Sequence, residues 1–263
     1  MLKVAVAQIS PEGTKEENAE KVMSFMDKAR GADVLVFPEY SLGARLELAD
    51  RLAEPPDGPL MRRLAAAARA RGITVFMGFL EEAEGGPFNS VAFISGGEVA
   101  VVHRKVLLFD ALGSNESRYV RPGDLPLSLV GLGDFTAGVA TCFELRFPEI
   151  FRSLALAGAD LFVVPSAWYA GHLKEEQWLV SAASRAMENV AYLVAADSAH
   201  RAFVGRSLVV NPWGHVELDL GRGEKLAAWT ISKEEVEEAR RALPLLDIAG
   251  RRGASWPVRR LDL

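Results

Sequence analysis

The stretch GVATCFELRFPE, residues 138–149, joins a predicted β-strand to a predicted helix and contains Cys142, the only cysteine in the chain. The apolar run 135–140 reads as the strand, and the run 148–157 has the pattern of a helix. A buried cysteine is often just a small hydrophobic side chain. Where a helix begins, however, backbone N–H groups can stabilise a thiolate or an oxyanion. Cys142 is therefore a candidate nucleophile, and a nucleophile needs a base.

Composition narrows the class of protein. The chain has 263 residues, of which 49% are hydrophobic and 25% charged, and its formal net charge is -5. This composition suits a globular core of ordinary size, whereas a nucleic-acid-binding surface would make the chain basic. A single cysteine forms no internal disulfide, so the fold needs no oxidising compartment. We expect a globular protein with no nucleic-acid partner.

The apolar runs bear on the location of the protein. The opening residues MLKVAVAQIS lack the longer apolar core and the small-residue cleavage site of a secretory signal. No run approaches the ~20 apolar residues that span a bilayer. We expect a soluble, cytoplasmic protein without a membrane partner, built as a single domain over 1–263.

Short β-branched runs alternate with alanine-rich helical patterns along the chain. The predicted strands are 4–7, 34–37, 73–79, 90–95, 98–103, 127–130, 135–140, 161–164, 191–195, 207–210 and 227–231. The predicted helices are 16–30, 59–71, 148–157, 174–188 and 233–243. Strands that alternate with helices, together with some hairpins, predict a layered α/β domain with mixed sheets.

An internal similarity relates the two halves of the chain. GADVLVFPEY (31–40) and GADLFVVPSAW (158–168) share Gly-Ala-Asp, an apolar strand and a proline at the carboxyl end of that strand. The similarity is a hint of two related β-α-β halves whose sheets face each other, with chance as the alternative. Ligands of α/β sheets tend to bind at the carboxyl ends of strands. The similarity therefore points to Glu39 and to 166–169.

Three charged residues are candidates to assist Cys142. Glu39 follows an apolar strand, Lys105 follows a hairpin, and Glu116 lies in the loop GSNESRY (113–119). Taken singly, each also fits a solvated turn or surface group. The four histidines, at 103, 172, 200 and 215, belong to no recognisable Cys–His signature. The residues alone thus leave the base for Cys142 open.

Three ordered motifs resemble the signatures of the nitrilase superfamily of carbon–nitrogen hydrolases: FPEYSL (37–42), HRKVLLFD (103–110) and TCFELRFPE (141–149). Further segments resemble other parts of that family. VAVAQIS (4–10) is similar to its first strand, and NES (115–117) is similar to the segment with its second glutamate. QWLVSAASRAMENVAYLVAADS (177–198) is similar to its helix–strand segment after the cysteine, and GRSLVVNPWG (205–214) is similar to its late strand and turn. The resemblance covers nearly the whole chain.

The resemblance implies a fold and an assembly. It implies an α-β-β-α sandwich of two mixed β-sheets flanked by helices, in subunits that associate as a homodimer or a higher homo-oligomer. It also implies that neither a metal nor a cofactor takes part. The sequence contains no phosphate-binding glycine-rich loop and no dinucleotide fingerprint.

The resemblance also implies catalytic roles. Glu39 would be the general base, Cys142 the nucleophile, and Lys105 with the backbone N–H of Phe143 the donors to the oxyanion. Glu116 would orient Lys105 or the substrate amide. A lysine between two carboxylates should stay charged, because opposite charges favour its protonated form.

Three other residues are candidates to bind substrate. Arg146 lies four residues after Cys142, a spacing that in an α-helix puts both on one face. It either meets a substrate carboxylate, as its counterpart does in some relatives, or ties its own turn to an acid such as Glu149. Trp168 either lines the pocket or packs in the core, and Tyr40 is a weaker pocket candidate. Trp178 reads as a helix-packing residue.

The chain departs from the family pattern at three places. Phe143 and Glu144 replace a common Tyr-Asp pair, Gln177 stands where many amidases carry histidine, and the segment 196–205 is short. The motifs look most like small ω-amidases and deaminated-glutathione amidases. We expect an amidase that releases ammonia from a small, carboxylate-bearing amide through a cysteine thioester.

Alternatives stay open at this point. An N-carbamoyl amino acid or amine amidohydrolase and a nitrilase would use the same residues, and a catalytically silent metabolite-binding protein would share the fold. The basic stretch IAGRRGASWPVRR (248–260), with Trp256, either crosses into a partner subunit or folds over its own sheet.

Overall fold

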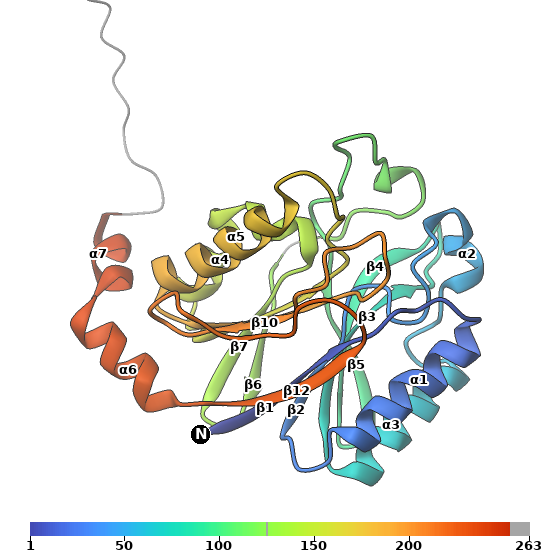
Figure 1. The fold of residues 1–263 in the computed structure, drawn as a ribbon, viewed down its shortest axis with the longest axis horizontal. Helices are drawn as coiled ribbons and strands as arrows, with labels where there is room; N and C mark the ends of the chain where they lie inside the picture. Colours follow the sequence, from blue (N-terminus) through green and yellow to red (C-terminus); the bar gives the residue numbers. More distant parts are fainter. Residues whose placement is uncertain (125, 253–263) are drawn as a thin grey trace, which may run out of the picture.

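The computed structural model describes residues 1–124 and 126–252. Its layers follow the order helix, sheet, sheet, helix (Figure 1). Trp256, which we expect either to cross into a partner subunit or to fold over its own sheet, lies outside the described residues. In the part of the chain that the structure describes, none of the helices has the length and apolar character needed to span a membrane.

Within the described residues, two six-stranded sheets form the centre of the fold. The first has the order β12-β1-β2-β3-β4-β5, with β12 (Lys225–Ile231), β1 (Leu2–Gln8), β2 (Val34–Val36), β3 (Thr74–Glu81), β4 (Phe88–Ser95) and β5 (Glu98–Arg104). The second has the order β11-β10-β9-β8-β7-β6, with β11 (Val216–Asp219), β10 (Leu208–Val210), β9 (Tyr192–Asp197), β8 (Leu161–Ser166), β7 (Phe135–Val139) and β6 (Leu129–Leu132). Both sheets mix parallel and antiparallel pairs.

Two pairs of helices cover the outer faces (Figure 1). Helices α1 (Lys15–Lys28) and α3 (Pro59–Arg71) pack on the first sheet, and α4 (Pro148–Leu156) and α5 (Lys174–Asn189) pack on the second. A separate apolar layer, which includes Val6, Phe76, Val163 and Val194, fills the space between the sheets. The structure therefore confirms the α-β-β-α sandwich.

Local sequence accounts for the positions of these elements. Thr14 and Glu17 form a capping box at the beginning of α1, and α3 begins with Pro59, whose missing N–H group would have no helical partner. Helix α3 ends at Gly72 in the left-handed conformation. Strands β2 and β8 are buried throughout because a helix layer and the opposite sheet cover their two faces.

The two sheets repeat one connectivity. β1, β2 and β3 run parallel as neighbours, and so do β7, β8 and β9 in the other sheet. This arrangement brings the carboxyl ends of β2 and β8 together, where the Glu39 N–H donates to the Ser166 carbonyl at 3.3 Å. The internal similarity thus marks equivalent strands, and a common origin of the two halves stays a prediction.

Several elements differ from the predicted ones. Cys142 begins an unpredicted 3₁₀-helix, η3 (Cys142–Arg146), which lies between β7 and α4. Helix α4 begins at Pro148, as predicted, because the proline ring disfavours a helical conformation at Phe147, which has φ −108° and ψ 94°. The α-helical spacing argument for Arg146 therefore does not hold.

Weakly patterned elements escaped prediction. They are β11, which mixes apolar and acidic residues, and the short or polar helices η1 (Leu46–Leu48), α2 (Ala49–Leu52), η2 (Glu116–Arg118) and α7 (Leu245–Arg252). Helix α6 (Lys233–Ala242) was expected, and it follows β12 at the edge of the sandwich.

Gly78 provides a test of the close contact between β3 and the turn after β2. A Cβ at this position would lie 2.5 Å from Glu39 Cα and 2.7 Å from the Pro38 oxygen. We expect Gly78→Ala to lower the free energy of unfolding by about 1–3 kcal/mol, because backbone must move. The control is Gly131→Ala on β6, where a Cβ meets no atom within 4 Å. Urea unfolding measures both, and equal effects would contradict the packing argument.

Candidate active site

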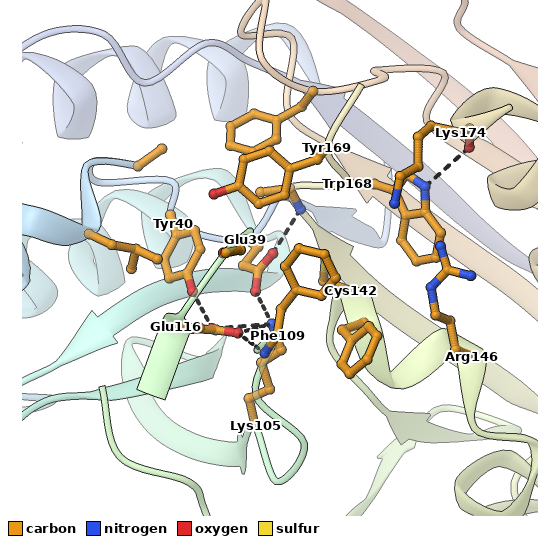
Figure 2. Close-up of a pocket in the computed structure, with 16 residues that line it drawn as sticks. Glu39, Tyr40, Lys105, Phe109, Glu116, Cys142, Arg146, Trp168, Tyr169 and Lys174 are labelled. Atoms are coloured by element: carbon orange, nitrogen blue, oxygen red, sulfur yellow. Dashed lines mark hydrogen bonds and ion pairs between the residues drawn. The ribbon is translucent and has the colours of Figure 1, made fainter. Parts of the chain in front are cut away.

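A cavity lies at the carboxyl ends of the central strands (Figure 2). All eight side chains that the sequence predicts for the site line this cavity: Glu39, Tyr40, Lys105, Glu116, Cys142, Phe143, Arg146 and Trp168. The four candidate catalytic residues come from separate elements. Glu39 follows β2, Lys105 follows β5, Glu116 begins η2 and Cys142 begins η3 after β7.

Lys105 is buried between two carboxylates. Its Nζ lies 3.0 Å from Glu39 Oε1 and 2.8 Å from Glu116 Oε2, and all three side chains are at most 3% exposed. Tyr40 donates its hydroxyl proton to Glu116 Oε1 at 2.5 Å. The Phe109 N–H donates to Glu116 Oε2 at 2.6 Å. Glu116 is therefore an acceptor with several fixed donors.

The charges of this cluster set its protonation. Burial acts to lower the pKa of Lys105, but the charges of Glu39 and Glu116 outweigh it and hold that pKa well above its usual value. Burial acts to raise the pKa of Glu116, and Lys105 reverses this and lowers it. Burial raises the pKa of Glu39, and Lys105 offsets only part of that rise. Glu39 is thus the more basic carboxylate.

Cys142 lies beside this cluster in a strained conformation. Its φ is +46°, in the left-handed region that non-glycine residues rarely occupy, and its side chain is buried. Tyr40, with φ +56°, shares this feature. Burial raises the pKa of the Cys142 thiol well above its usual value, and the charge of Glu39 raises it further. The thiol is therefore neutral at rest, and forming the thiolate requires a base.

Glu144 connects the cysteine turn to the loop after the lysine. Its Oε2 accepts the Thr141 N–H at 2.7 Å and lies 2.7 Å from His103 Nε2. Its Oε1 accepts the N–H groups of Val106 at 2.7 Å and Leu107 at 3.3 Å. Glu144 differs from the aspartate that is common in the family, but it keeps a carboxylate at this position, with four defined partners.

Arg146 faces the cavity rather than a neighbouring acid. Its guanidinium lies 4.5 Å from the centre of the Trp168 ring and donates to Gln177 Oε1 at 2.7 Å. Among the described residues no carboxylate forms an ion pair with it, so the suggested contact with Glu149 is wrong. Lys174 Nζ lies 6.0 Å from the same ring, on the far side of the cavity from the lysine cluster (Figure 2).

The two tryptophans have related roles. Trp168 lines the cavity and also packs on Trp178, with ring centres 5.5 Å apart, so both interpretations of Trp168 apply. Trp178 is fully buried on α5, as its predicted packing role requires, and its indole N–H donates to the Arg206 carbonyl.

Sequence reasoning missed several residues of the site. Asn89 is buried on β4 and contacts both glutamates, and Lys174 adds a second cation to the cavity. The aromatic rings of Phe109 and Phe203 form part of the remaining wall, together with Tyr169, which lies in the range 166–169 that the internal similarity indicated. A polar Asn89 inside the apolar run FNSVAFIS was an available signal, whereas Lys174, Phe109 and Phe203 are ordinary loop or helix-end residues.

Comparison with known proteins identifies the family. Residues 3–241 match the carbon-nitrogen hydrolase family, and the chain belongs to it. It is a hydrolase of carbon–nitrogen bonds other than peptide bonds, of the amidase type. Within the residues that the structure describes, no group of three or more His, Cys, Asp or Glu side chains is placed to hold a metal ion.

Particular relatives refine this assignment. The chain is 30% identical to the deaminated glutathione amidase of Escherichia coli O157:H7 over 250 residues, which cover 93% of this chain and 95% of the relative. It is 27% identical to the 2-oxoglutaramate amidase of Bacillus subtilis, covering 89% and 92%. The fold matches Saccharomyces cerevisiae Nit3, a member of branch 10 of the nitrilase superfamily, with TM-score 0.84, 24% identity and coverage of 96% and 97%.

Lys105→Met tests the electrostatics of the cluster. The change leaves two buried carboxylates without their cation, which typically costs about 3–5 kcal/mol. The pKa values of the two carboxyl groups then rise in the folded state. At low pH both groups are protonated, which favours folding, and this stabilisation of the folded state is lost as the pH rises. We expect the loss of stability, measured by urea unfolding, to be smaller at pH 5 than at pH 7.

The matched control is Lys21→Met, which removes an exposed ion pair with Glu224. We expect this variant to lose at most about 1 kcal/mol, with little dependence on pH. An identical loss for Lys105→Met at both pH values would mean that the carboxylates do not change protonation.

Proposed function

We propose that this protein hydrolyses a small, carboxylate-bearing amide through a thioester on Cys142 and releases ammonia. The observation that carries the proposal is the convergence of Cys142, Lys105 and two glutamates of opposite pKa shift on one cavity. The proposed reaction uses these groups and water, and needs neither a metal nor a cofactor.

Glu39 is the proposed general base. Its Oε2 accepts the Ala167 N–H at 2.8 Å, and Glu39, Ala167 and Cys142 all line the one cavity. Glu39 takes the thiol proton while sulfur attacks the amide carbon, and the carbonyl electrons move to oxygen. A base of raised pKa suits this transfer, because its proton affinity lies closer to that of the thiol.

Lys105 and the backbone N–H of Phe143 are the proposed donors to the oxyanion. A charged donor in a buried site stabilises developing negative charge more strongly than it would in water. When the intermediate collapses, the C–N bond breaks and the nitrogen leaves as ammonia with the proton from Glu39. Glu116 keeps Lys105 charged and in place.

The second half of the reaction regenerates the enzyme. Glu39 takes a proton from water, and the resulting hydroxide attacks the thioester carbon. Lys105 again stabilises the oxyanion. Collapse breaks the C–S bond, releases the carboxylic acid, and returns the proton from Glu39 to the sulfur of Cys142.

The cations support an anionic substrate. Arg146 and Lys174 flank Trp168, and no carboxylate of the described residues pairs with either. Burial lowers the pKa of Lys174, and the neighbouring charge of Arg146 lowers it further, so an anion between them would relieve their repulsion. The relative from Bacillus subtilis is named for 2-oxoglutaramate, an amide that carries a carboxylate.

The apolar outer face of α5 supports a homodimer. Val180 and Met187 are 65% and 49% exposed and lie two helical turns apart, and Trp213 in the turn that packs against Met187 is 41% exposed. We propose that a second copy covers this face.

Light scattering at micromolar concentration should give the dimer mass for the wild type and a smaller mass for Val180→Glu. A wild type of monomer mass would refute the dimer.

Ammonia release by wild type and Cys142→Ala tests the reaction. The panel contains ω-amides, N-carbamoyl amino acids, N-carbamoyl amines and nitriles. We expect release from ω-amides, and a loss of at least about a thousandfold in Cys142→Ala, because the nucleophile is gone. Preference for carbamoyl compounds or nitriles would instead indicate those alternatives. Release that survives in a folded Cys142→Ala variant would exclude the thioester.

A second arm of the same assay tests the cations. Glutaramate and pentanamide have equal chain lengths, but only glutaramate carries a carboxylate. We expect Arg146→Gln to raise KM for glutaramate by about 10- to 100-fold, the effect of losing a hydrogen bond to a charged group, and to leave pentanamide nearly unchanged. Absence of release from every compound, with no acyl adduct on Cys142 by intact mass, would favour a silent binding protein.

A further inference from the structure

Asn89 occupies a buried position between the two glutamates of the active site. It is the second residue of β4, it is 0% exposed, and its carbonyl accepts the Lys105 N–H at 2.8 Å. Strand β4 thus holds the lysine backbone and places the Asn89 side chain beside the lysine cluster. The mechanism above assigns no role to this amide.

Its amide nitrogen has three acceptors within reach. Nδ2 lies 2.6 Å from Glu39 Oε1, 2.7 Å from the Tyr40 hydroxyl oxygen and 2.8 Å from Glu116 Oε1. An amide nitrogen carries two hydrogens, so it can satisfy two of these at a time. Tyr40 donates its own proton to Glu116, which leaves the phenol oxygen free to accept.

The neutral charge of Asn89 matters for this cluster. Glu39 and Glu116 share one cation, Lys105, so a negative charge remains, and like charges raise the pKa of one another. A neutral donor stabilises both anions without adding a second cation. The Asn89 Oδ1 accepts no hydrogen bond from the described residues although it is buried, which indicates that the amide is held for its N–H side.

The two carboxylate oxygens of Glu39 accept hydrogen bonds from different donors. Oε1 accepts from Asn89 and from Lys105, whereas Oε2 accepts, among the described residues, only the N–H of Ala167, a residue that lines the same cavity as Cys142. We propose that Asn89 is a positioning residue that anchors Oε1 of Glu39, so that Oε2 stays directed at the Cys142 thiol. This inference rests on the proposed role of Glu39 as the base.

Loss of Asn89 should change the pH at which the enzyme becomes active. The charge of Glu39 interacts with Lys105 and with titratable groups on neighbouring elements, and the Asn89 amide donates to it; these titratable groups are Glu116, Tyr40, Tyr169, Cys142 and Asp197. Burial raises the pKa of Glu39, and the hydrogen bond from Asn89 is one of the contacts that lower it. Without this donor Glu39 retains its proton to higher pH, so the acid limb of the activity profile moves upward.

The test compares Asn89→Leu and Asn89→Ala with a neighbouring control, Ser90→Ala. The leucine variant removes the donor at similar volume, and the alanine variant removes it with a smaller side chain, which covers the case in which leucine prevents folding. Ser90 is equally buried on β4, but its hydroxyl donates to Glu81, outside the cavity. Circular dichroism establishes that each variant is folded.

The first readout is hydrolysis of an ω-amide that the wild type cleaves. We expect kcat to fall by about 10- to 100-fold in both Asn89 variants, with KM nearly unchanged and the acid limb of kcat/KM higher by about one pH unit. Ser90→Ala should keep the wild-type profile. A loss of activity with an unmoved acid limb would overturn the inference and leave a structural role only.

The second readout needs no substrate. Iodoacetamide has one thiol to modify, because Cys142 is the only cysteine. The acid limb of its alkylation rate reports removal of the first proton from the Glu39–Cys142 pair. We expect the same upward movement in both Asn89 variants. If no amide is cleaved but this limb moves, the proposed function fails and the inference stands. If cleavage depends on Cys142 but neither limb moves, the inference fails alone.

Discussion

The buried contact of Lys105 with Glu39 and Glu116 is the constraint on which the site depends. Removing charges from water costs several kcal/mol per ion, so such a cluster persists only when its partners are fixed by further hydrogen bonds. Tyr40 and Phe109 supply these to Glu116. In return, the surroundings that exclude water make the lysine charge act strongly on any anion formed at the cysteine.

The sandwich holds each part of the site from a different segment. The turn after β2 is joined to the end of β8 by the Glu39 backbone and by its side chain, which bind Ser166 and Ala167. Glu144 joins the cysteine turn to the loop after the lysine in the same way. The geometry of the base, the cation and the nucleophile is therefore a property of how the two sheets pack, rather than of any single loop.

The sequence predicted what strong local patterns encode. The central strands and the main helices stand out through their apolar runs and helical spacing, whereas the roles of Glu39, Lys105 and Cys142 were predicted from the resemblance of three ordered motifs to a known family. The left-handed backbone of Cys142 and the 3₁₀-helix that it begins were missed because no local pattern of apolar residues reports them. The partner of Arg146, Gln177, lies on another helix, and no local pattern reports such a contact. Roles assigned to these residues remain predictions until the variants are measured.

The left-handed backbone of Tyr40 and Cys142 has a consequence for the evolution of this protein. Such a conformation costs about 1 kcal/mol or more for a side chain with a Cβ, and glycine avoids that cost. At position 142, relief of strain and the presence of a thiol are incompatible. Selection for stability alone would therefore favour glycine at this position, whereas the proposed role as nucleophile requires the cysteine.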